Sequence, residues 1–89
     1  MTSAIYYEET QSLVQTFSQE DQAYFQDLWD YFNFAGFLYE EKALREQVYN
    51  LALDFSQASG DGLTAKDYFG QDPKGMADQI IENMPKEST

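Results

Sequence analysis

The chain contains neither cysteine nor histidine among its 89 residues. Without these two residue types it can form no disulfide bond, none of the common structural zinc sites, and no serine–histidine or cysteine–histidine catalytic pair of the usual kind. Core packing must therefore stabilise the fold without such help. The absence of cysteine, and so of disulfide bonds, is compatible with a reducing compartment, and we expect a cytoplasmic location.

Positive charge is also scarce. Five lysine and arginine residues stand against sixteen aspartate and glutamate residues, which leaves a net charge of −11, and residues 1–41 carry eight of the acids and no base. Such a charge repels the phosphates of nucleic acids and anionic lipids, so we expect no direct binding to nucleic acid or to a membrane surface. A basic protein partner is compatible with this charge.

Long apolar runs are missing as well. A helix that crosses a bilayer needs roughly 20 consecutive, mainly apolar residues, and no apolar run in this sequence approaches that length. The N-terminus also lacks the basic segment and apolar stretch of a signal peptide. The sequence therefore predicts neither a membrane-spanning segment nor a signal peptide.

The sequence does contain a regular succession of helix signals. Apolar residues recur at three- and four-residue intervals, which predicts helices with one buried face: Phe25, Leu28, Phe32 and Ala35; Leu44, Val48, Leu51 and Phe55; Met76, Ala77, Ile80, Ile81 and Met84. The predicted starts are Ser18, Glu40 with Glu41, Thr64 with Asp67, and Asp72 before Pro73, and the predicted ends are Gly36, Gly60, Gly70 and Pro85. A looser pattern predicts a short helix within residues 1–16.

These signals predict a single all-α domain over residues 1–89, a small four- to five-helix bundle or orthogonal helical domain. Within it we expect residues 1–17 to be loosely attached and residues 86–89 to form a frayed tail. Connections of only a few residues between the predicted helices favour a compact arrangement.

The most unusual segment is residues 31–39, in which five of nine residues are aromatic. No single helix face can bury all of them. Phe32 and either Phe34 or Phe37 are expected to complete the core, whereas Tyr31, Tyr39 and Trp29 are expected to be at least partly exposed. Two interpretations stay open: large aromatics filling a thin core, or a surface for a partner or for self-association. The candidate partner-binding residues are Trp29, Tyr31, Phe34, Phe37 and Tyr39.

The many carboxylates predict no reactive site. Asp27, Asp30, Glu40 and Glu41 have the pattern of solvated helix faces. The acidic stretch 54–67 resembles a calcium loop, but alignment on its glycine places unsuitable residues at two of the ligand positions and no bidentate glutamate at position twelve. A glycine-rich phosphate loop is absent from the sequence. We therefore predict no catalytic, cofactor-binding or metal-binding residues.

Residues 64–73 read TAKDYFGQDP and are followed by Met76, Ala77 and Asp78. This segment resembles the C-terminal signature of the helical domain-of-unknown-function family 1129, common in low-GC Gram-positive bacteria. The resemblance extends over roughly residues 18–85 and is to a soluble form, without the membrane-spanning helices of many relatives. It implies a bacterial helical domain and no activity, because that family has no established function. Helix capping and turn formation also explain the same residues.

Three functions are compatible with these observations. The first is a non-enzymatic protein–protein interaction or regulatory module, acting as a homodimer or with another protein, in particular a basic one. The alternative is an acidic DNA mimic that inhibits a nucleic-acid-binding protein by occupying its basic groove. A carboxylate enzyme that uses a divalent ion ranks last, because no suitable cluster of ligands is recognisable.

Overall fold

The structure is a computed structural model that describes residues 2–35 and 39–84. Over these residues the chain forms five α-helices and no strand: α1 (Ser3–Val14), α2 (Gln19–Ala35), α3 (Glu41–Gly60), α4 (Ala65–Phe69) and α5 (Pro73–Glu82). The predicted all-α class is confirmed.

The helix starts lie where the capping residues predicted them. The Ser18 hydroxyl accepts a hydrogen bond from the Asp21 N–H at 3.2 Å at the start of α2. Thr64 and Asp67 form a complete capping box on α4. The Asp72 carboxylate accepts from the Lys74 N–H at 3.1 Å at the start of α5. Each cap satisfies a backbone donor that the helix itself cannot, which is why these residue types mark helix starts.

The predicted end of α3 at Gly60 is confirmed, and the left-handed residue of the turn follows two positions later. Gly60 is the last helical residue, and it is Gly62 that adopts a left-handed φ of 89°. The Leu63 N–H donates to the Ala58 carbonyl at 3.1 Å, and the Gly62 N–H donates to the Ser59 carbonyl at 3.0 Å. This pair of bonds is a Schellman motif, whose left-handed position favours glycine. Gly62, not Gly60, therefore reverses the chain.

The predicted stop at Gly70 is also confirmed. Gly70 caps the C-terminal end of α4 with a φ of 105°. Helix α5 ends at Glu82 with Asn83 as its C-cap. Pro85 and the tail 86–89 lie outside the described residues, so their predicted roles stay predictions.

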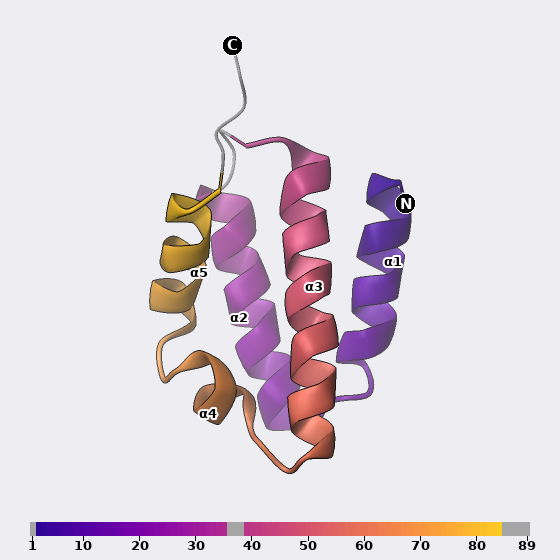
Figure 1. The fold of residues 1–89 in the computed structure, drawn as a ribbon, viewed down its shortest axis with the longest axis vertical. Helices are drawn as coiled ribbons and strands as arrows, with labels where there is room; N and C mark the ends of the chain where they lie inside the picture. The colour runs from indigo at the N-terminus through magenta and orange to yellow at the C-terminus, as the bar shows by residue number, and fades with distance from the viewer. Residues whose placement is uncertain (1, 36–38, 85–89) are drawn as a thin grey trace.

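The helices form two closely packed pairs, α1 with α3 and α2 with α5, and α4 lies across one end (Figure 1). Helices α2 and α5 run in the same direction, opposite to α1 and α3, so the C-terminal ends of α2 and α5 lie together at the top of Figure 1. The N-terminal ends of α1 and α3, whose dipoles are positive, lie at the same end, so its charge depends on the side chains there.

Helix α1 lies along α3 through aromatic and cationic contacts. The rings of Tyr6 and Tyr49 lie 5.5 Å apart between centroids. The Arg45 guanidinium lies over the Tyr7 ring, 5.1 Å from its centroid. These contacts give α1 a defined position, whereas how tightly residues 1–17 are held stays a prediction.

Aromatic rings fill the core where α3, α4 and the chain between α1 and α2 meet. Phe55 is completely buried, and its ring centroid lies 4.9 Å from that of Phe17 and 5.6 Å from that of Phe69. Phe25 contacts the same two rings. The predicted buried stripes of α2 and α3 are confirmed at Phe25, Leu28, Phe32, Val48, Leu51 and Phe55, and Leu44 is partly buried against the same core.

Helix α4 is only five residues long and is held by α2 at both of its ends. The Asp21 carboxylate accepts a hydrogen bond from the Ala65 N–H at 2.9 Å. The Tyr24 hydroxyl donates to the Gly70 carbonyl at 2.7 Å. Because so short a helix is not stable alone, these two bonds and the burial of its apolar residues fix its position.

Tyr24 should make stability sensitive to alkaline pH. Burial, and secondarily the charge of Asp72, raise the pKa of the Tyr24 hydroxyl above 10.0. The unfolded chain therefore releases this proton first, so the contribution of Tyr24 is complete below about pH 10 and is lost as pH rises through the folded-state pKa. Urea midpoints measured between pH 8 and 11.5 should fall more steeply for the wild type than for Tyr24→Phe; equal slopes would contradict this role.

Candidate interaction surfaces

The structure places four of the five candidate partner-binding residues. Phe34 is 84% exposed on α2. Tyr31 and Tyr39 are partly buried against the core, as expected. Trp29 is only 6% exposed, so the expectation of partial exposure was wrong for this residue. Phe37 lies outside the described residues.

Trp29 is buried because α1 covers its side of α2. Its ring centroid lies 5.2 Å from that of Tyr7, which belongs to α1. The sequence pattern placed Trp29 on the flank of the core stripe, but a flank becomes interior when another helix packs on it. Trp29 therefore belongs to the core and offers little surface to a partner.

Phe34 points away from the core because of its position on the helix. It follows the buried Phe32 by two residues, which in an α-helix is a rotation of about 200°. Asp30 and Asp27, one and two turns earlier on the same side of α2, are exposed as predicted. A large aromatic side chain thus lies in solvent beside carboxylates.

We call Tyr31, Phe34 and Tyr39 the aromatic end. Tyr31 and Phe34 belong to the last turns of α2, and Tyr39 lies two residues before α3. The C-terminal end of α2 lies beside that of α5 (Figure 1). Neither helix has a basic residue in its last turn, so the negative ends of both helix dipoles are unneutralised by their own side chains. Exposed Asp78 and Glu82 on α5 add two carboxylates. The positive end of the α3 dipole lies at the same end of the bundle, so the negative character of the aromatic end comes from these exposed carboxylates.

A hollow of about 460 Å³ lies at this end of the molecule. It is lined by Tyr39, Asp78, Ile81 and Glu82, which combine an aromatic ring, an aliphatic side chain and two carboxylates. Asp78 makes an exposed ion pair of 3.5 Å with Lys74, one turn earlier on α5. The amino-acid sequence does not reveal this hollow, because it depends on residues 39 and 78–82 coming together.

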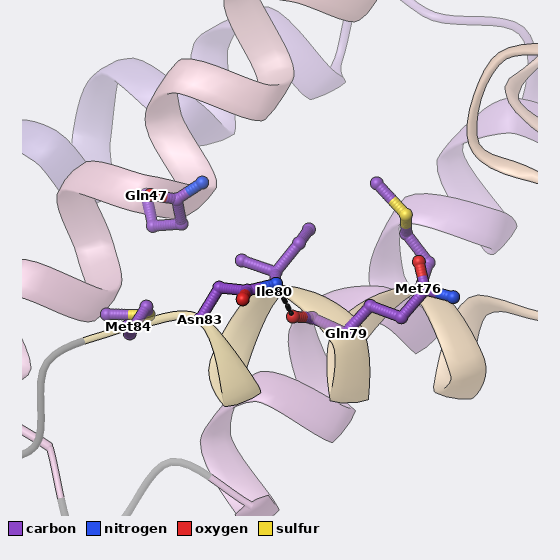
Figure 2. Close-up of a pocket in the computed structure, with 6 residues that line it drawn as sticks. All are labelled: Gln47, Met76, Gln79, Ile80, Asn83 and Met84. Carbon is purple, nitrogen blue, oxygen red and sulfur yellow. Dashed lines mark hydrogen bonds between the residues drawn. The ribbon is translucent and has the colours of Figure 1, made fainter.

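A second concave surface lies between α3 and α5 and has different chemistry. Figure 2 shows Gln47 on α3 facing a row of side chains on α5 across a groove of about 280 Å³. The α5 residues are Met76, Gln79, Ile80, Asn83 and Met84. None of the six lining residues is charged, and three amide side chains alternate with three apolar ones in lining the groove. Met76, Ile80 and Met84 were predicted as core; they are only partly buried.

The remaining carboxylates give little sign of a reactive site. Glu40 and Glu41 are exposed, as predicted for solvated faces. Asp21 is the exception, since it is buried and hydrogen-bonded to the Ala65 N–H. Over residues 2–35 and 39–84, His, Cys, Asp and Glu side chains form no group of three that could hold a metal ion. Within the same ranges, no helix is long and apolar enough to cross a membrane.

The chain was compared with known proteins by sequence and by fold. The resemblance of residues 64–78 to the helical domain-of-unknown-function family 1129 stays a prediction, and its capping and turn residues are accounted for by the structure of α4 and α5. No family model, curated protein or solved structure matches the chain.

Proposed function

We propose that the chain is a non-enzymatic protein–protein interaction module that binds its partner through the aromatic end. The exposure of Phe34, at 84%, carries the proposal. Burying a phenylalanine side chain stabilises by about 1.5–3 kcal/mol relative to leaving it in water. Folding does not bury Phe34, so a partner that covers it would gain this stabilisation. Half-buried Tyr31 and Tyr39 add amphipathic rings of the kind enriched at protein interfaces.

The charge around the aromatic end supports a basic protein as the partner. The exposed carboxylates of Asp78 and Glu82 attract a basic surface. A second copy of the chain is less favoured, because two molecules of net charge −11 repel each other. The interface would thus combine an apolar anchor with complementary charge.

Replacing Phe34 with alanine should weaken partner binding without affecting the fold. A central aromatic anchor contributes about 2 kcal/mol or more to binding, which is roughly a 30-fold change in Kd. Partners captured from a lysate by tagged wild-type protein should be lost or depleted with Phe34→Ala, and calorimetry on the identified partner should give the change in Kd. Far-UV circular dichroism should stay unchanged.

The matched control is Leu53→Ala, which removes an exposed apolar side chain from α3. It should leave binding unaltered. Equal binding by wild type and Phe34→Ala would contradict the proposal. The alternative function, an acidic DNA mimic, predicts a different pattern: binding insensitive to Phe34→Ala and falling steeply as salt rises.

A further inference from the structure

We infer that the hollow at the aromatic end binds an arginine side chain of the protein partner. The inference rests on the proposed function and names the partner chemistry of the same surface. The hollow is lined by Tyr39, Asp78, Ile81 and Glu82.

These four side chains match the parts of an arginine. A guanidinium group is planar and weakly hydrated, so it stacks on an aromatic face such as the ring of Tyr39 while donating hydrogen bonds to carboxylates. Asp78 and Glu82 are four residues apart on α5, so their side chains are neighbours on one helix face. Ile81, which is 7% exposed, adds a small apolar patch to the lining that the aliphatic stem can contact.

Within the chain, Arg45 already binds a tyrosine ring and a carboxylate together. The Arg45 guanidinium lies over the Tyr7 ring, 5.1 Å from its centroid, and pairs with the Glu41 carboxylate at 2.8 Å. Arg45 is the only arginine in the sequence. The hollow presents the same groups, a tyrosine ring and carboxylates, so an arginine that fills it must come from another molecule.

Lys74 does not prevent an arginine from binding to the carboxylates of the hollow. Its ammonium group lies 3.5 Å from one Asp78 oxygen, and both side chains are exposed, so the pair is weak. Among the described residues, Glu82 takes part in no ion pair. An incoming guanidinium can therefore bind Glu82 directly and compete for Asp78.

The test is an NMR titration of the full chain with N-acetyl-arginine N-methylamide. We expect saturable changes in the chemical shifts of the backbone amides of Tyr39 and residues 78–82. The Kd should be millimolar, because the ligand contributes only one side chain to the contact. The citrulline analogue, which has the same shape and no charge, should give no saturable shifts. The lysine analogue should bind at least about threefold more weakly, because an ammonium group is more strongly hydrated and cannot stack.

Two variants test whether Glu82 and Tyr39 bind the guanidinium group. Glu82→Gln and Tyr39→Leu should each weaken arginine binding by about fivefold, whereas Glu46→Gln, which removes an exposed carboxylate of α3 outside the hollow, should leave it unchanged. Shifts that rise linearly and spread over many carboxylates, or equal binding of lysine, would overturn the inference. Failure of the proposed function would look different: arginine would still saturate the hollow while Phe34→Ala left partner binding unchanged.

Discussion

Phe55→Ala should lower the free energy of unfolding by about 3–5 kcal/mol. The side chain is completely buried, and its ring packs against Phe17, Phe69 and Tyr68 at centroid distances of 4.9, 5.6 and 6.1 Å. Truncation removes the buried apolar area and leaves a cavity between helices that are joined by this cluster. A domain of this size is stable by about 5–13 kcal/mol, so the loss is a large fraction of the total.

Urea unfolding measures this loss directly. Trp29 is the single tryptophan and is buried, so its fluorescence should follow unfolding together with far-UV circular dichroism. Phe34→Ala removes the same atoms at an 84% exposed position and should change stability by no more than about 0.5 kcal/mol. Similar losses in the two variants would show that the aromatic cluster is not the centre of the core.

Local signals made the helices predictable from the sequence. The caps at Ser18, Thr64 and Asp72 act on backbone groups two or three residues away, so sequence spacing alone identifies them. The end of α3 at Gly60 was predictable, but the left-handed residue of the following turn was not, because Gly60 and Gly62 are both glycines near the helix end. Only the hydrogen bonds of the turn show which of the two takes the left-handed conformation.

Long-range contacts were not predictable in the same way. Trp29 is buried by Tyr7 of α1, and Asp21 caps a helix that begins 44 residues later in the chain. Neither contact leaves a local pattern, since each depends on how whole helices pack. Asp21 was interpreted only as a favourable charge in the first turn of α2, a position where aspartate is common for that reason alone.

The candidate surface was predictable in part. The density of aromatics in residues 31–39 identified the region, because one helix face cannot bury them all. The helical rotation between Phe32 and Phe34 then decides which ring is exposed, once the orientation of α2 is known. The hollow beside Tyr39 could not be predicted, because it requires α5 to lie next to the start of α3.

Asp21→Ala should lower the free energy of unfolding by about 1.5–3 kcal/mol, the range for a hydrogen bond to a charged group. Asp21 is 6% exposed, and its carboxylate accepts from the Ala65 N–H at 2.9 Å. Alanine would leave this donor buried without a partner at the first residue of α4. Asp21→Asn retains an acceptor oxygen and should cost less.

Hydrogen exchange identifies the origin of the loss. The Ala65 amide should exchange much faster in Asp21→Ala than in the wild type, because it loses its hydrogen bond to α2. The increase should exceed that of amides elsewhere in the core, which report only the loss of global stability. The bond from Tyr24 to the Gly70 carbonyl remains in this variant. Asp27→Ala removes the same charge from an exposed position on α2 and should change stability by no more than about 0.5 kcal/mol. If Asp27→Ala were equally damaging, net charge rather than the hydrogen bond would be responsible. An unchanged Ala65 amide would show that α4 is positioned by its buried Ala65 and Phe69 side chains alone.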